Sequence, residues 1–196
     1  MGLTSEQVHW IGGGVFTGLA AALVLHETGA IGGRWPRYLL PVVFIVYGIE
    51  NFIDPWIHGA AAPKDYAAET AQHLVQGAVM LAVGLVELLR ARGRLEARAF
   101  GLVLPLGLLV FGGMFLFHAQ HEAAAPAIVL TVQHRIFGAT LAVAALAKAA
   151  AELGGEKAQA FRVAWLLPLL VFGLEMLLYT EGGAGMAGHG AAHGGH

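Results

Sequence analysis

The chain has 196 residues, of which 57% are hydrophobic and 12% are charged, and its mean hydropathy is +0.67. Soluble domains carry about 25% charged residues, so this composition excludes an ordinary soluble protein and indicates a chain that crosses a lipid bilayer several times. The formal net charge of −2 gives no basis for binding nucleic acid. The absence of cysteine excludes disulfides, thiolate metal ligands and thiol nucleophiles.

Six apolar runs follow one another along the chain, separated by Gly, Pro or charged residues. Lipid cannot satisfy backbone polar groups, so runs of about 20 residues are expected to be helices. No basic segment precedes the first run, so we expect no cleaved signal peptide and a first helix that stays in the protein. The predicted spans are 8–28, 38–57, 69–90, 99–119, 127–148 and 162–180.

Lysine and arginine predict the orientation of these spans, because they gather in the cytoplasmic loops of membrane proteins. The loops after the first, third and fifth spans contain nine of the 11 basic residues. Of the other two, Lys64 lies in an opposite loop and Arg135 inside the fifth span. We therefore expect both termini outside. The amino-acid usage is rich in Ala, Gly, Leu and Arg. This usage favours a prokaryotic protein, and hence the plasma (inner) membrane of a prokaryote.

The spans also repeat their sequence patterns. Each odd-numbered span opens with a His four residues before a Gly, namely His9/Gly13, His73/Gly77 and His134/Gly138. Each even-numbered span has Leu-Pro, expected in its first turn, and then an aromatic-Gly pair, namely Tyr47-Gly48, Phe111-Gly112 and Phe172-Gly173. We predict one all-α transmembrane domain, residues 1–182, built from three two-helix hairpins, 1–60, 61–124 and 125–182, with pseudo-threefold symmetry.

Alignment of the three copies places ionisable side chains at the outer ends of the spans. His9, His73 and His134 are expected about one turn below the outer surface, with Glu50, Met114 and Glu175 one turn deeper. Ionisable groups inside spans are costly and usually functional, although Met114 also suits a gap-filling core position. We predict a transition-metal site whose ligands come from His73, His118, His134, His9, Glu50, Glu175, Asp54, Met114, His121 and Glu122.

The donor types favour copper and leave zinc or iron open. Imidazole suits Zn, Cu and Fe, and three His with a carboxylate or water fit a four-coordinate Zn or Cu site. Met114 and His118, four residues apart, would put a thioether beside an imidazole, which favours Cu(I). Residues 183–196 are predicted to form a disordered tail that captures metal weakly through His189, His193 and His196, although a solvated tail or a tag looks similar.

Two sequence resemblances bear on these predictions. The stretch FLFHAQHE, residues 115–122, followed by QHRIFGA, resembles the F-H-x-H signature of the transmembrane-protein-45 family of polytopic membrane proteins. His118 and His121 carry this resemblance, which implies a multi-pass fold and no defined chemistry. The Gln-His openings are similar to those of membrane proteins of copper resistance and of cytochrome-oxidase copper assembly, which implies copper handling. Those proteins are longer, and their His-Met-x-x-His patterns are absent from this chain.

Three functions remain open from the sequence. The first is copper handling or delivery at the outer face, with a periplasmic metallochaperone or metalloenzyme as partner. The second is a membrane-embedded zinc or iron enzyme acting on a lipid-like substrate. The three-His membrane ceramidases use a catalytic Ser, but Ser5 is the only Ser here, so Glu50 or Glu175 would be the base. The third is a b-type haem protein with His73 or His134 and His118 as axial ligands, which the nearby carboxylates disfavour.

Overall fold

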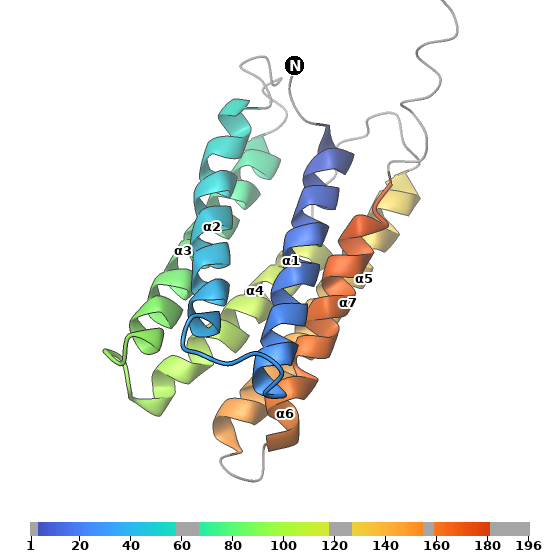
Figure 1. The fold of residues 1–196 in the computed structure, drawn as a ribbon. Helices are drawn as coiled ribbons and strands as arrows, with labels where there is room; N and C mark the ends of the chain where they lie inside the picture. The colour runs from blue at the N-terminus through green and yellow to red at the C-terminus, as the bar shows by residue number, and fades with distance from the viewer. Residues whose placement is uncertain (1–3, 58–66, 118–126, 155–158, 181–196) are drawn as a thin grey trace, which may run out of the picture.

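The protein is an all-helical bundle in the described parts of the computed structural model, which are residues 4–57, 67–117, 127–154 and 159–180. Figure 1 shows the helices running roughly side by side. Six of them are long and apolar enough to cross a membrane, as the sequence predicts. The elements are α1 (Ser5–Glu27), η1 (Pro36–Tyr38), α2 (Leu39–Ile57), α3 (Ala67–Ala91), η3 (Arg98–Leu102), α4 (Val103–Leu116), α5 (Ala127–Leu153), α6 (Gln159–Ala164) and α7 (Leu166–Leu177).

The even-numbered spans all begin with a short separate turn or helix. The 3-10 helices η1 and η3 precede α2 and α4, and the six-residue α6 precedes α7. Pro41, Pro105 and Pro168 then stand third in α2, α4 and α7. Because proline has no N–H and its ring crowds the carbonyl four residues earlier, a continuous α-helix cannot run through these positions without distortion. The expectation of Leu-Pro in the first turn is therefore confirmed.

The helices pack most extensively in three pairs, α2 with α3, α4 with α5, and α1 with α7. These pairs join each predicted hairpin to the next, whereas α1 and α2 of one predicted hairpin touch only sparsely. In Figure 1, α2 and α3 lie on one side of the bundle, α1, α5 and α7 lie on the other, and α4 connects the two groups. Hydropathy predicts which segments are helices, but it does not predict these partners.

Each of the three pairs meets at one glycine from each helix, and all six glycines are buried. An added Cβ would lie 2.7 Å from the carbonyl oxygen of Gly173 if built on Gly13, and 2.9 Å from that of Gly48 if built on Gly77. Built on Gly138, it would lie 2.5 Å from the carbonyl oxygen of Gly112. The two backbones of each pair are therefore in direct contact, which small residues alone permit.

Aromatic and aliphatic side chains fill the space between the pairs. Phe16 contacts Phe44 and Phe172 edge to face, with ring centroids 6.4 and 5.3 Å apart. Phe44, Phe137, Leu104, Leu166 and Leu169 are among the most fully buried side chains. Large apolar side chains also cover the outside, as a surface facing lipid requires; examples are Leu106, Val143, Leu146 and Leu167.

The two ends of the bundle differ in their polar residues. We call the end where α1 begins the His9 end and the opposite end the Arg90 end. At the Arg90 end, the Arg90 guanidinium lies 2.8 Å from a Glu87 oxygen and 3.0 Å from a Glu152 oxygen. Lys148 binds the other Glu152 oxygen at 2.6 Å and lies 5.0 Å from the Trp165 ring centre. Helix α5 continues to Leu153 rather than ending near residue 148, and this last part of the helix carries the Lys148–Glu152 pair.

Replacement of Arg90 with alanine is expected to lower the free energy of unfolding by about 1–3 kcal/mol, because the carboxylates of Glu87 and Glu152 would lose their shared guanidinium in a half-buried place. Arg92 is exposed, and its alanine variant is the matched control, with an expected change within about 0.5 kcal/mol. Unfolding in mixed micelles with increasing SDS measures both. Equal stability of the two variants would contradict a stabilising role for the network.

Candidate functional site

Two of the predicted histidines meet at the His9 end of the bundle. The His9 ring stacks on the Tyr179 ring with centroids 3.8 Å apart and an interplanar angle of 12°. The His134 ring stands edge-on to both, 5.9 Å from His9 and 5.8 Å from Tyr179. Helices α1 and α5 and the residues that follow α7 thus contribute one ring each to a cluster that we call the His9–His134–Tyr179 cluster.

The chain after α7 is held in place by hydrogen bonds to α1 and α5. The Trp10 indole N–H donates to the Tyr179 carbonyl oxygen at 2.9 Å. The Gln133 side-chain amide donates to the Thr180 carbonyl oxygen at 2.8 Å and accepts from the Thr180 N–H at 3.0 Å. The Thr180 hydroxyl donates to Glu6 at 3.1 Å. These contacts fix the backbone on both sides of the Tyr179 ring, so Tyr179 remains against His9 although the helix has already ended.

The hydrogen bond of His134 determines which ring nitrogen carries the proton in the neutral imidazole. Its Nδ1 lies 2.8 Å from the Leu130 carbonyl oxygen, which can only accept, so Nδ1 donates. The lone pair of the neutral ring is then on Nε2, the nitrogen that can bind a metal ion or accept a proton. His134 is 6% exposed, and the rings of Phe115 and Phe137 lie 5.7 Å from it. Its orientation is therefore set by packing as well as by the hydrogen bond.

The third predicted histidine of the ring, His73, does not join this pair. In the described residues, no group of three or more His, Asp or Glu side chains could hold one metal ion. Helix α5, which carries His134, packs on α4 and α7; α1, which carries His9, packs on α7, and α3, which carries His73, packs on α2 and α4. His9 and His134 thus share α7 as a neighbour, and His73 is half-buried.

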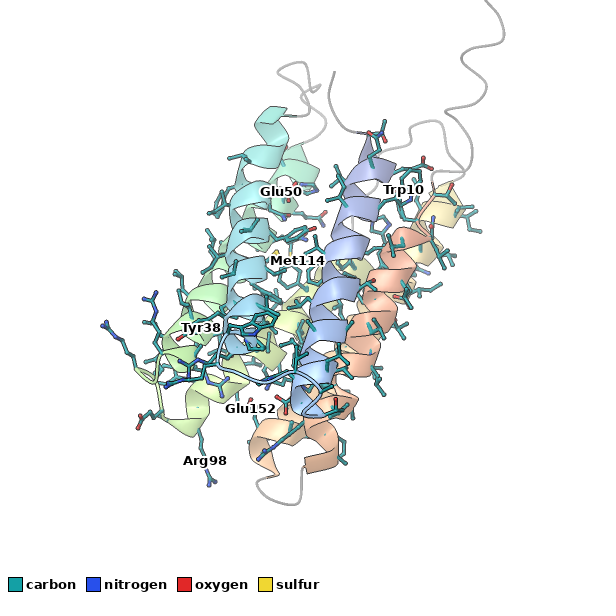
Figure 2. All side chains as sticks on the ribbon, in the orientation of Figure 1. Trp10, Tyr38, Glu50, Arg98, Met114 and Glu152 are labelled. Atoms are coloured by element: carbon teal, nitrogen blue, oxygen red, sulfur yellow. The ribbon has the colours of Figure 1, made fainter. Side chains whose placement is uncertain are left out.

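Two of the predicted deeper ligands, Glu50 and Glu175, hydrogen-bond to neighbouring side chains. Glu50 accepts a hydrogen bond at 3.1 Å from Asn51, whose amide lies 4.0 Å from the Met80 sulfur on α3. Figure 2 labels Glu50 towards the His9 end and Met114 nearer the middle of the bundle. Glu175 accepts a hydrogen bond at 2.8 Å from the Thr140 hydroxyl of α5. Thr140 is two turns from Gln133 and on the same side of α5, so this contact lies on the side of α5 that faces α7.

Several predicted ligands lie outside the described residues and stay predictions from the sequence. Asp54 belongs to α2, but the structure does not describe its side chain. The others are His118, His121 and Glu122 between α4 and α5, and the tail residues His189, His193 and His196.

The glutamines of the two Gln-His openings form hydrogen bonds to backbone carbonyl oxygens at the His9 end. Gln133 binds the backbone after α7, and Gln72 of the other Gln-His opening donates to the Phe117 carbonyl oxygen at the end of α4 at 3.5 Å. Each glutamine thus ties an odd-numbered span to the end of the next span in the chain. Tyr179 occupies the position of the repeat that Asp54 and His118 occupy in the other copies, and this alignment is the sequence signal for its place in the cluster. Comparisons of the chain with protein-family models, curated proteins and solved structures find no match.

Proposed function

We propose that this chain is an integral membrane protein that binds a transition metal ion at the His9 end. Copper is the favoured ion. The observation that carries the proposal is the approach of His9 and His134 from two helices, with Nε2 of His134 as the lone-pair nitrogen of its neutral ring. Imidazole nitrogen is a good donor for copper, zinc and iron. The resemblance of the Gln-His openings to those of copper-handling membrane proteins favours copper among these ions.

Two imidazoles are an incomplete set of ligands, which suits transfer better than permanent storage. Structural metal sites are closed by four protein ligands, whereas sites that act on or exchange ligands keep a position open. His118, His121 and Glu122 are further donors in the sequence between α4 and α5, and their part in the site stays a prediction. We therefore propose that the ion passes between this pair and a metallochaperone or a metalloenzyme on the same side of the membrane.

The proposed orientation places the His9 end outside the cell, in the periplasm of a prokaryote with an inner membrane. The support is the distribution of basic residues, which gather in the loops at the Arg90 end as the cytoplasmic loops of membrane proteins do. The proposed threefold repeat is supported by three buried Gly–Gly contacts and by three helices that begin just before Leu-Pro. In a repeat of this kind, each even-numbered span packs on the odd-numbered span of the next copy, and α7 closes the ring on α1.

A metal titration of the purified protein tests the proposal. The protein is stripped with a chelator in detergent and titrated in parallel with Cu(I), Cu(II), Zn(II) and Fe(II) against a competing chromophoric chelator. We expect the tightest binding for Cu(I). A visible spectrum of the untreated protein tests the haem alternative, because a Soret band that persists through purification would replace a bound metal ion with haem as the resident group.

Deletion of residues 185–196 is expected to slow metal loading and to leave the final amount of bound metal unchanged, because the tail is proposed to capture ions and the bundle to hold them. Stopped-flow loading with limiting metal measures the rate, and elemental analysis measures the final content. Substitution of His189, His193 and His196 with asparagine keeps the tail length and is expected to reproduce the slower loading. Loss of all bound metal on deletion would make the tail the binding element.

A further inference from the structure

Arg135 is a charged side chain on an apolar, exposed stripe of α5, and the metal proposal does not use it. The stripe also contains Ile128, Ala139 and Leu146, which follow one another with Arg135 at spacings of seven, four and seven residues. All four side chains are exposed. Because an exposed apolar stripe of a spanning helix faces lipid, Arg135 is a positive charge on a lipid-facing surface.

No acidic side chain of the described residues neutralises Arg135, because none of their ion pairs includes it. Helix α4, which packs on α5, contains no charged residue. On α7, Glu175 bonds to Thr140, which is five residues after Arg135 and therefore about 140° away around α5. The five N–H donors of the guanidinium thus have no anionic acceptor in the described part of the chain.

The position of Arg135 along α5 puts its guanidinium within reach of lipid headgroups. Arg135 lies seven residues after the start of the candidate span Ile128–Leu153. Its neighbour His134 packs beside His9, which lies three residues after the start of the span Glu6–Glu27. At a rise of ~1.5 Å per residue, these positions are ~10 Å and ~5 Å below the ends of their spans. A helical side chain leaves the backbone towards the helix N-terminus, and α5 begins at the His9 end, so the guanidinium extends towards the headgroups on that side.

We propose that Arg135 binds the phosphate of an anionic phospholipid, such as phosphatidylglycerol, in the leaflet at the His9 end. The planar guanidinium suits two parallel hydrogen bonds to phosphate oxygens. An acyl chain of the same lipid would lie along Ala139 and Leu146, because the chains of that leaflet run from the headgroup towards the middle of the bilayer. A zwitterionic lipid carries its own cation beside the phosphate, so the anionic class is preferred. The proposal goes beyond the proposed metal function and does not rest on it.

The experiment uses the absence of cysteine from the chain. A single cysteine introduced as Ala139→Cys carries a fluorescent label one turn from Arg135, on the same stripe. The labelled full chain is placed in vesicles of phosphatidylcholine and phosphatidylglycerol, with bromine on the acyl chains of one lipid or the other. Bromine quenches a label that it touches, so quenching measures which lipid lies beside position 139. We expect phosphatidylglycerol there at about fivefold its share of the bilayer, the effect of one basic side chain at an anionic lipid surface.

Three controls separate the site from the rest of the membrane surface. Arg135→Gln is expected to remove the enrichment, and Arg135→Lys, which keeps the charge and loses the planar fork, to retain part of it. A label at Val46→Cys is expected to show no enrichment, because Val46 is 57% exposed on α2, a helix without basic residues. Inorganic phosphate in the buffer is expected to leave the enrichment at position 139 unchanged, because the ion has no acyl chain to hold it on the stripe.

The outcomes that overturn the proposal are specific. Equal quenching by the two lipids at position 139, or an enrichment that survives Arg135→Gln, would show that Arg135 does not select the lipid. Quenching by neither lipid would show that protein covers this stripe, and loss of the enrichment in inorganic phosphate would make the site one for a free anion. Circular dichroism and gel filtration check the fold of each variant. No readout depends on bound metal, so a failure here is distinct from a failure of the metal proposal.

Discussion

Replacement of His134 with alanine is expected to weaken metal binding by at least about 100-fold. Loss of a residue that only orients a metal ligand costs ~10–100-fold in affinity, so loss of one of two proposed ligands costs at least the upper part of that range. His134 has this role in the proposal because its Nδ1 proton is engaged by the Leu130 carbonyl oxygen, which places the lone pair on Nε2. Competition with a chromophoric chelator measures the affinity.

His26 offers a matched control for this prediction. It lies on α1 near the Arg90 end, and its Nδ1 is also within hydrogen-bond distance of a backbone carbonyl oxygen, 3.3 Å from that of Ile31. His26→Ala is expected to leave the affinity unchanged. Circular dichroism and gel filtration check that both variants keep their fold. Binding by His134→Ala at the strength of the unchanged protein, or an equal loss in His26→Ala, would remove His134 from the site.

Replacement of Gly138 with alanine is expected to lower the free energy of unfolding by about 1–3 kcal/mol through overpacking. The added Cβ would lie 2.5 Å from the carbonyl oxygen of Gly112 and 2.8 Å from the Leu116 side chain. The first of these neighbours is backbone, so α4 and α5 would have to move apart to relieve the contact. Unfolding in mixed micelles with increasing SDS measures the loss.

Gly14 is the control for Gly138, because it lies in the middle of α1 and an added Cβ there would meet nothing within 4 Å. Alanine is favoured over glycine in a helix interior by about 1 kcal/mol, so Gly14→Ala is expected to be neutral or stabilising. The same chemical change is thus expected to destabilise the protein at Gly138 and not at Gly14. Gly13→Ala and Gly77→Ala should resemble Gly138→Ala. A neutral Gly138→Ala would contradict the direct backbone contact.

The helices were predictable from the sequence, but the way they associate was not. Long apolar runs give the six spans, and the fixed φ of Pro41, Pro105 and Pro168 explains why α2, α4 and α7 begin where they do. The glycines four residues after His9, His73 and His134 lie at the closest backbone contacts, so this spacing is a sequence signal of close approach. The identity of each partner helix depends on the matching of whole helix surfaces, which no local pattern in the sequence describes.

The sequence predicts the level of the candidate site in the membrane, but it does not predict which helices bring their side chains together there. Alignment of the copies predicts which residues share a level in the membrane, and on that basis it selected both His9 and His134. It does not predict the lateral distance between helices, so His73 was grouped with them although no three His, Asp or Glu side chains of the described residues could hold one metal ion. Glu175 was grouped with them by level as well; its carboxyl group accepts a hydrogen bond from Thr140, and its part in a metal site stays a prediction.

Elemental analysis of the purified protein tests the central claim most directly. The protein is purified without added metal, beside the double variant His9→Ala/His134→Ala, and both are checked for an intact helical fold. We expect a stoichiometric amount of a transition metal, with copper favoured, in the unchanged protein and none in the double variant. A folded protein that contains no metal, or a double variant that keeps its full metal content, would contradict the assignment of these two histidines to a metal site.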